Sequence, residues 1–90
     1  MAKRRKKSAV RQWSVYIVRC SDGTLYTGMS NDVKRRVKRH NAGTGARYTR
    51  SRRPAVLVHH ENGMTRSQAL VREYAIKAMP KVKKEKLCGT

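Results

Sequence analysis

The sequence predicts an α/β domain of the α+β type, with a three-stranded antiparallel sheet flanked by helices in the order β-β-α-β-α. β-Branched and aromatic residues fall in short runs, as is typical of strands. Two other segments open with residues that start helices. The chain has 90 residues, which is enough for one domain. Because a chain of this length buries roughly 60% of its unfolded surface, the core must be compact, which suits one sheet covered by a few helices.

The first two strands are predicted to form a hairpin. Residues 13–20, WSVYIVRC, and residues 24–28, TLYTG, flank the loop Ser21-Asp22-Gly23. A three-residue loop with Gly in third place fits this sequence, and so does a two-residue Asp-Gly turn. The three-residue loop puts Tyr16 and Tyr26 on one face of the sheet, whereas the two-residue turn puts them on opposite faces. We choose the three-residue loop because it also gathers the apolar residues of the other face, which are Trp13, Val15, Ile17 and Leu25.

The first helix is predicted from its ends. Asn31 or Asp32 can cap a helix that runs to about His40. Asn41-Ala42-Gly43 is a typical helix end, since Gly readily adopts the left-handed conformation that stops a helix. At 3.6 residues per turn, one face of this helix carries Val33, Val37 and His40, with Arg36 on its edge.

A basic loop and a third strand come next. Residues 44–53, TGARYTRSRR, are predicted to be a loop that holds one aromatic residue, Tyr48. Residues 55–60, AVLVHH, are typical of a strand. Adjacent side chains of a strand point to opposite faces, so a metal shared by His59 and His60 is not expected. We interpret both histidines as structural or exposed.

The second helix is predicted to begin at Thr65-Arg66-Ser67-Gln68, which matches a capping box, and to run to about Met79. Residues 81–88, KVKKEKLC, would add a short, weakly helical end. Glu73 lies outside the apolar arc of the second helix, which is formed by Leu70, Val71, Tyr74, Ala75 and Ala78.

Charge dominates the composition, because 23 Lys and Arg face only 5 Asp and Glu, for a formal net charge of +18. Such an excess predicts a polyanionic partner, and we expect nucleic acid; the charge alone leaves open whether it is DNA or RNA, and DNA is the form that we expect first. A membrane partner is not expected, because no helix pairs a long apolar face with a basic one, and no stretch approaches the ~18 apolar residues of a transmembrane helix. Residues 1–12 are predicted to be a disordered basic tail, which either contacts phosphates or only keeps the chain soluble. The remaining residues, 13–90, would form the single domain.

The two cysteines, Cys20 and Cys88, lie far apart, without a CxxC motif or a histidine at ligand spacing. This excludes a zinc site built on thiolates and a disulfide scaffold. We expect both thiols to be reduced, in a cytoplasmic protein. Nothing in the sequence indicates a small-molecule cofactor, and protein partners are left open.

Two triplets and three later residues form a familiar arrangement. Ser14-Val15-Tyr16 and, ten residues on, Tyr26-Thr27-Gly28 resemble the paired GIY and YIG elements of the GIY-YIG nuclease family. Arg36 falls where that family has its catalytic Arg, and His40 where it has a His or Tyr. Glu73 falls where it has its metal-binding Glu.

The resemblance covers about Trp13 to Met79 and extends to one loop. GARYTR, residues 45–50, is similar to the basic loop of the small, stand-alone, single-domain bacterial branch of the family. Ser14 replaces the first Gly of the pattern, and Thr27 replaces its second central Ile. Met29 stands where the excision-repair branch commonly has Lys.

The resemblance implies a metal-dependent endonuclease, structure-directed and active in DNA repair or processing, with one Mg²⁺ or Mn²⁺ ion on Glu73. A hard cation keeps most of its waters, so one or two carboxylates and the substrate phosphate are enough to bind it. Arg36 would hold the scissile phosphate through two parallel hydrogen bonds. Tyr16 or Tyr26 would orient or deprotonate the attacking water, and His40 would serve as base or proton relay.

Each assignment also has a structural alternative. Glu73 and Lys77 would make a favourable surface pair at i,i+4. The two tyrosines would be plain cross-strand packing, and His40 would only end the apolar stripe of its helix. The rival function is a non-catalytic nucleic-acid-binding protein on the same fold. Under either function, the expected nucleic-acid contacts are Lys34, Arg35, Arg39, Arg47, Tyr48, Arg50, Arg52 and Arg53.

Overall fold

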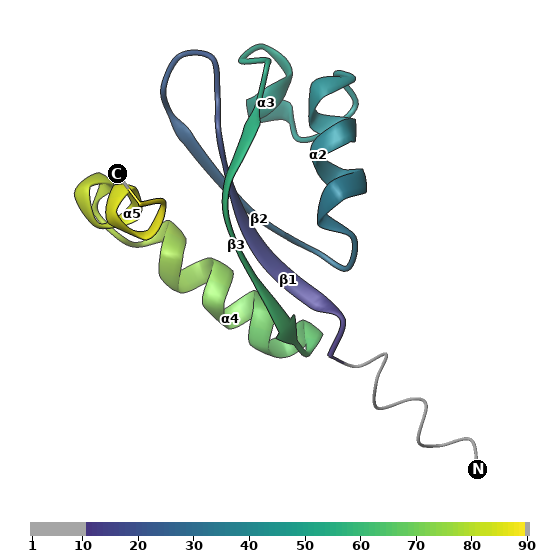
Figure 1. Ribbon diagram of the computed structural model, residues 1–90, viewed down its shortest axis with the longest axis vertical. Coiled ribbons are helices and arrows are strands. Elements are labelled where there is room, and N and C mark those ends of the chain that lie inside the picture. The colour runs from purple at the N-terminus through teal and green to yellow at the C-terminus, as the bar shows by residue number, and fades with distance from the viewer. Residues whose placement is uncertain (1–10, 90) are drawn as a thin grey trace.

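The computed structural model describes residues 11–89 and shows a three-stranded antiparallel sheet with helices on both faces (Figure 1). The strands are β1 (Trp13–Arg19), β2 (Leu25–Ser30) and β3 (Val56–Met64). The helices are α2 (Val33–Asn41), α3 (Arg47–Arg50), α4 (Arg66–Lys77) and α5 (Lys81–Leu87). The sheet order is β2-β1-β3, so β1 is the central strand. The predicted fold class and element order are confirmed. Most of the predicted basic tail, residues 1–10, lies outside the described residues.

The hairpin register agrees with the three-residue loop. Val18 pairs with Tyr26, so the two tyrosines lie on the same face, since Tyr16 is two residues before Val18. The amide of Cys20 donates to the carbonyl of Thr24 over 2.8 Å and closes the loop. Gly23 has φ +84°, the left-handed conformation that the third loop position requires. The predicted register is therefore confirmed.

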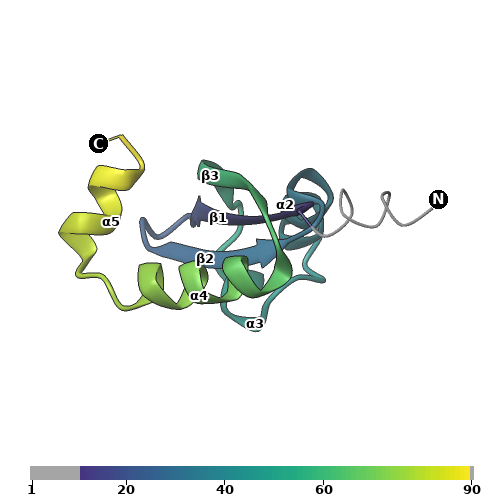
Figure 2. The same ribbon diagram turned by 90° about the horizontal axis from the view of Figure 1, so that it is seen from below.

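The two faces of β1 bury two separate clusters, and Figures 1 and 2 show α2 and α4 on opposite sides of the sheet. On one face Val15 and Ile17 pack with Ala69 and Ile76 of α4. On the other face Tyr16 and Val18 pack with Ala55, and the half-buried Tyr26, Val33, Val37 and Leu57 surround them. The two tyrosines of the predicted site, Tyr16 and Tyr26, lie on this second face.

Helix α2 begins and ends where its sequence predicts. Asp32 caps it, with its carboxylate accepting from the amide of Arg35 over 3.1 Å. At the other end Gly43, with φ +82°, donates to the carbonyl of His40. The amide of Thr44 donates to the carbonyl of Arg39, which completes a Schellman end. These two caps fix the position of His40, the one fully buried residue of the helix.

Two elements extend beyond the prediction. The predicted loop over residues 44–53 contains the short helix α3, in which the carbonyl of Ala46 accepts from the amides of Thr49 and Arg50. An arginine-rich segment without apolar periodicity gave no sign of this helix. The third strand was predicted to end at residue 60, but β3 continues to Met64, which pairs with Trp13. Pairing with β1 keeps its polar last residues extended.

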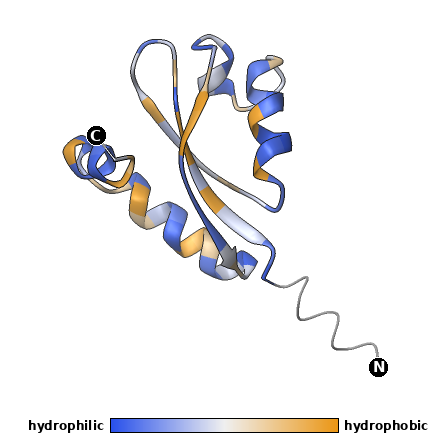
Figure 3. Ribbon diagram, viewed as in Figure 1, coloured by the Kyte–Doolittle hydropathy of each residue, from blue (hydrophilic) through white to orange (hydrophobic). Residues whose placement is uncertain are grey.

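The capping box of α4 is confirmed, but the predicted apolar arc does not face the core. Thr65 accepts from the amide of Gln68 over 3.0 Å, and the Gln68 side chain accepts from the amide of Thr65 over 2.9 Å. The fully buried residues of α4 are Ala69 and Ile76. Figure 3 shows apolar colouring along parts of α4 and mainly hydrophilic colouring on α2. The large apolar side chains of the arc are exposed, at 54% for Leu70, 70% for Val71 and 77% for Tyr74.

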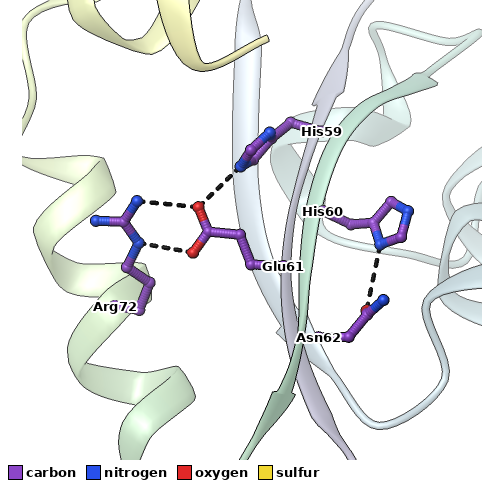
Figure 4. A network of polar contacts seen from close by, with 5 residues as sticks. All are labelled: His59, His60, Glu61, Asn62 and Arg72. Carbon is purple, nitrogen blue, oxygen red and sulfur yellow. Dashed lines mark hydrogen bonds and ion pairs between the residues drawn. The ribbon is translucent and has the colours of Figure 1, made fainter.

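A polar network joins β3 to α4 on the face away from α2 (Figure 4). The Glu61 carboxylate accepts two hydrogen bonds from Arg72, over 2.8 and 2.9 Å, and lies 2.9 Å from His59 Nε2. These bonds, chiefly those from Arg72, lower the pKa of Glu61 to about 2. His60 points elsewhere and contacts Asn62. His59 is thus a structural residue, and the two histidines share no partner.

Candidate active site

A chain of hydrogen bonds runs through the interior between β1, α2 and α3. The hydroxyl of Tyr16 lies 2.9 Å from Nε2 of His40, and Nδ1 of His40 lies 2.8 Å from the hydroxyl of Thr49. The Thr49 hydroxyl in turn donates to the carbonyl of Ala46 over 3.0 Å. Tyr16 is 1% exposed, and His40 and Thr49 are 0% exposed. Both ring nitrogens of a buried histidine therefore have partners.

Two glycines make room for this chain. A Cβ on Gly28 would lie 2.5 Å from the hydroxyl oxygen of Tyr16, so only glycine lets the phenol lie across β2. A Cβ on Gly45 would lie 2.6 Å from Nδ1 of His40. Side chains at either position would push the Tyr16–His40 pair apart. The third residue of the second triplet is thus small for a steric reason.

Tyr26 is held in a column of stacked side chains. Its ring meets that of His40 edge-on, with centroids 5.4 Å apart, and stacks on Tyr48 at 5.9 Å. The guanidinium of Arg52 covers the far face of Tyr48 at 4.0 Å from its centroid. Asp22 of the hairpin loop accepts from Arg52 Nε over 3.0 Å. The Tyr26 ring is fixed in this way, but its hydroxyl makes no hydrogen bond within residues 11–89.

Electrostatic coupling joins Tyr16 to other predicted site residues. Burial raises the pKa of the Tyr16 phenol, and the neighbouring Tyr26 and Glu73 raise this pKa further, while Arg36 lowers it. Burial, followed by the charge of Arg36, lowers the pKa of His40 below its usual 6.5. His40 is therefore neutral at pH 7 and able to accept a proton. Tyr26, Arg36 and Glu73 therefore all influence the pKa of the Tyr16 phenol.

The exposed side of α2 supplies cations beside this site. Arg36 lines a shallow polar cleft together with Arg35, Arg39 and the residues that lead into the helix, Ser30, Asn31 and Asp32. Lys34 is also exposed on α2. This face has the positive charge that a phosphate backbone requires. Within residues 11–89, no helix is long and apolar enough to cross a membrane.

The predicted contacts in and after α3 divide into two groups. Arg52 and Tyr48 are engaged with each other, and Arg53 donates to the carbonyls of Arg50 and Asn41. These three side chains therefore support the fold, whatever else they contact. Arg47 and Arg50 are exposed and line an open hollow with Tyr48, Ser51 and Arg52. Arg47 and Arg50 are the more available of the predicted cations here.

Glu73 reaches the site from the opposite face of the sheet. Of the five residues that the resemblance picks out, only four, Tyr16, Tyr26, Arg36 and His40, lie on the α2 side of the sheet, and Glu73 belongs to α4. The Glu73 side chain is 17% exposed, and Lys77 Nζ lies 3.4 Å from its carboxylate. Within the described part of the chain, no three His, Cys, Asp or Glu side chains gather where they could hold a metal. Any metal here would depend on one carboxylate.

The sequence analysis did not anticipate Thr49, Gly45 or Asp22. Thr49 stood inside a predicted loop, and Asp22 was assigned only to a turn. The signal that could have found Thr49 is the burial of His40, because a buried imidazole needs a partner at each nitrogen. Because Tyr16 partners one ring nitrogen of His40, the nearest Ser and Thr residues after α2 were the candidates for the partner of the other ring nitrogen.

The chain is similar to a known family over most of its length. The model of the GIY-YIG catalytic domain matches residues 12–86. A UPF0213 protein of Haloquadratum walsbyi is 59% identical over 73 residues, which cover 81% of this chain and 82% of the relative. A UPF0213 protein of Staphylococcus aureus is 56% identical over 73 residues, covering 81% of this chain and 89% of the relative.

Two solved structures are also similar. The solution NMR structure of a UPF0213 protein from Bacillus halodurans has a TM-score of 0.56 and 43% identity, covering 86% of this chain and 82% of the other. A solution NMR structure of a protein from E. faecalis has a TM-score of 0.55 and 39% identity, covering 81% and 78%. Both support the same fold at high sequence identity.

Proposed function

Because the chain belongs to the GIY-YIG family, we propose that it is a metal-dependent endonuclease that hydrolyses phosphodiester bonds in nucleic acid. The observation that carries this proposal is the buried Tyr16–His40 hydrogen bond, over 2.9 Å, within the electrostatic reach of Arg36 and Glu73. A protein that only binds nucleic acid has no need to bury a tyrosine and a neutral histidine and to shield a carboxylate beside its basic surface.

Glu73 is the residue that would hold the metal, Mg²⁺ or Mn²⁺. Its carboxylate is largely shielded from solvent and, within residues 11–89, its ion-pair partner is the half-exposed Lys77, so it fits a hard cation that keeps most of its waters. When bound, such an ion would supply positive charge to the phosphate oxygens in the transition state. Thiolate and imidazole ligands are not part of this proposal.

The protein's own residues would move the proton. Tyr26, whose hydroxyl has no partner within residues 11–89, would orient the attacking water. The water would give its proton to the Tyr16 oxygen while Tyr16 passes its own proton to His40, which avoids an isolated phenolate of raised pKa. Because Tyr16 is only 1% exposed, it would meet a single water and not bulk solvent.

Arg36 and the cations around it would hold the substrate. Arg36 would donate two hydrogen bonds to the scissile phosphate, a geometry that Lys cannot reproduce. Nearby phosphates would be contacted by Lys34, Arg35, Arg39, Arg47 and Arg50, with secondary contacts from Tyr48, Arg52 and Arg53. We propose DNA as the substrate, in repair or processing, and the cytoplasm as the location, where the free thiols of Cys20 and Cys88 are ordinary.

The test is a cleavage assay on branched, flapped and linear DNA and RNA with Mg²⁺ or Mn²⁺. Glu73→Gln keeps the size of the side chain and removes the ligand charge, so cleavage should fall below detection while binding persists or tightens. The matched control is Glu85→Gln, which removes the same charge from α5, where Glu85 pairs with Arg19. Wild-type cleavage that Glu73→Gln leaves intact would exclude the assignment.

Arg36→Ala should also abolish cleavage, but with some loss of affinity, because Arg36 would touch the phosphate directly. Lys34→Ala is its control on the same helix and should weaken binding without abolishing cleavage. The second candidate function is a non-catalytic binder, which the Glu73–Lys77 ion pair at 3.4 Å favours, since it is an ordinary i,i+4 pair. This alternative expects no cleavage by the wild type on any substrate and similar small affinity changes in all variants.

A further inference from the structure

The positions of the hydrogens along the Tyr16–His40–Thr49 chain follow from its last acceptor. The carbonyl of Ala46 can only accept, and it lies 3.0 Å from the Thr49 hydroxyl, so the single hydroxyl hydrogen of Thr49 lies between them. Without that hydrogen, two oxygens would face each other at 3.0 Å with repelling lone pairs. The Thr49 oxygen thus presents a lone pair to Nδ1 of His40, 2.8 Å away, and Nδ1 carries the hydrogen.

The other nitrogen of His40 is then an acceptor. A neutral imidazole has one N–H, and the lowered pKa of His40 keeps the ring neutral at pH 7. Nε2 therefore accepts from the hydroxyl of Tyr16 over 2.9 Å. The reverse arrangement, with the hydrogen on Nε2, would leave the hydroxyl hydrogen of a 1% exposed tyrosine without any acceptor in residues 11–89. An unpaired buried hydroxyl costs about 1–3 kcal/mol.

We propose that Thr49 is a positioning residue that fixes His40 in the Nδ1–H tautomer and so directs the Tyr16 proton toward Nε2. Thr49 does not touch the substrate. Its role rests on the proposed function, because the tautomer matters only if Tyr16 exchanges a proton with the attacking water. In that step the water's O–H bond breaks as its oxygen bonds to phosphorus. Its proton goes to the Tyr16 oxygen and the Tyr16 proton goes to Nε2. The phosphorus–oxygen bond to the leaving group breaks, its electron pair stays on the leaving oxygen, and that oxygen takes a proton from solvent water.

The same contacts suit the product of this step. His40 as imidazolium would donate from Nδ1 to the Thr49 oxygen and from Nε2 to the Tyr16 oxygen, so neither bond needs to be remade. The groups that face His40 are Tyr16 from β1, Tyr26 from β2, Arg36 from its own helix and Thr49 from α3. Arg36 is the one charged group among them, and its charge opposes protonation of His40 until the anionic phosphate is present.

The tautomer can be measured directly by ¹⁵N NMR of the imidazole in the full chain at pH 7, without any substrate. Wild type is expected to show a protonated Nδ1 and a bare Nε2. Thr49→Val keeps the shape and removes the hydroxyl, so the Nδ1–H population should fall. The kcat for cleavage should fall about ten- to a hundred-fold with KM unchanged, less than the roughly 10²- to 10⁴-fold contribution of a general acid–base group, because Thr49 acts only through His40.

Two variants keep this test decisive. Thr49→Ser retains the hydroxyl and should restore the tautomer and bring kcat to within about threefold of wild type. Thr27→Val is the same exchange at another buried threonine, on β2, and should change neither the His40 tautomer nor kcat. A wild-type spectrum with the hydrogen on Nε2 would overturn the proposal. A Thr49→Val protein that keeps the wild-type tautomer and kcat would also overturn it. If the valine variant does not fold, a Thr49→Ser protein that loses the Nδ1–H tautomer or the wild-type kcat, although it keeps the hydroxyl, would do the same.

The spectrum also separates this proposal from the enzyme activity. If the His40 tautomer depends on the Thr49 hydroxyl but the wild type cuts no substrate, Thr49 positions His40 without any role in cleavage. The proposed endonuclease activity is then overturned as well. If the wild type cuts and the tautomer does not depend on Thr49, the endonuclease stands and the positioning role is overturned.

Discussion

Glu73 has a competitor for any metal ion, and that competitor is Lys77. The Lys77 ammonium lies 3.4 Å from the Glu73 carboxylate, and its own side chain is 52% exposed. Exposed pairs of this kind contribute about 0–1 kcal/mol, so a divalent cation can displace the lysine at modest cost. Lys77 would therefore tune the metal requirement without being part of the chemistry.

Lys77→Gln should lower the Mg²⁺ concentration at half-maximal cleavage by about 1.5- to 5-fold, which corresponds to roughly 0.2–1 kcal/mol. The measurement is a metal titration of the cleavage rate at fixed substrate. Lys81→Gln removes the same charge from the start of α5 and serves as the control. Equal shifts in both variants would mean that net charge, and not the ion pair with Glu73, sets the metal requirement.

His40 should make the fold sensitive to mild acid. Its pKa is lowered in the folded protein, by burial and by Arg36, relative to about 6.5 in the unfolded chain. Below that unfolded pKa the unfolded state binds more protons, so the His40 contribution to stability is complete above pH ~6.5 and is lost as pH falls. Urea unfolding at pH 7 and pH 5 should show a loss that His40→Gln largely removes. His60→Gln, at an exposed position, should retain it.

At the scale of the element, α4 shows that burial is decided by geometry and not by a count of apolar residues. Ala69 and Ile76 face Val15 and Ile17 of the sheet, and the same side of the helix carries Glu73 and Arg72, whose charged ends have partners. The larger apolar residues one position away remain exposed. The helix thus directs Glu73, the proposed metal ligand, toward the sheet.

Two alanine substitutions on α4 should separate the two sides. Ile76→Ala creates a cavity in the fully buried cluster and should cost about 2–4 kcal/mol of unfolding free energy. Leu70→Ala, at a position 54% exposed, should stay within roughly 0.5 kcal/mol of wild type. Chemical denaturation measures both. If Leu70→Ala lost more unfolding free energy than Ile76→Ala, the predicted apolar arc would be the buried side of α4.

The elements that the sequence predicts well are those with local rules. The Ser21-Asp22-Gly23 loop, the Asp32 cap and the Thr65 capping box each depend on a few neighbouring residues, and each is present. Helix α3 and the last residues of β3 depend on partners distant in the chain, which no local pattern contains. Of the candidate site, the positions of Tyr16, Tyr26 and His40 followed from register and helix period. The contact with Thr49 required the path of α3.

For the whole molecule, charge is the dominant property. A formal net charge of +18 on 90 residues is a source of self-repulsion that a polyanion relieves. The described cations lie mainly on α2, around α3 and along α4 and α5. Binding by such a surface should be dominated by phosphate contacts and should depend on salt more than on sequence.

Affinity for duplex DNA should fall with salt, by roughly 0.9 in log affinity per phosphate contact for each unit of log salt concentration. Fluorescence anisotropy over a range of salt concentrations gives this slope. Removing residues 1–12 should reduce the slope if that basic segment contacts phosphates, and should leave it unchanged if the segment only keeps the chain soluble. Affinity that does not change between low and physiological salt would contradict nucleic-acid binding through this charge.

The central place of β1 has a consequence for the order of events during folding. Its partner β2 is joined to it by a three-residue loop, and hairpins of this kind form in about 1–10 μs. Its partner β3 arrives only after α2 and α3 have been spanned, which is a slower, long-range closure. We therefore expect Tyr16 and Tyr26 to become neighbours early, while His40 and Thr49, carried on the intervening helices, join them late. A partly folded chain would hold both phenols without the imidazole that accepts the Tyr16 proton, so catalytic competence would begin only with the completed fold.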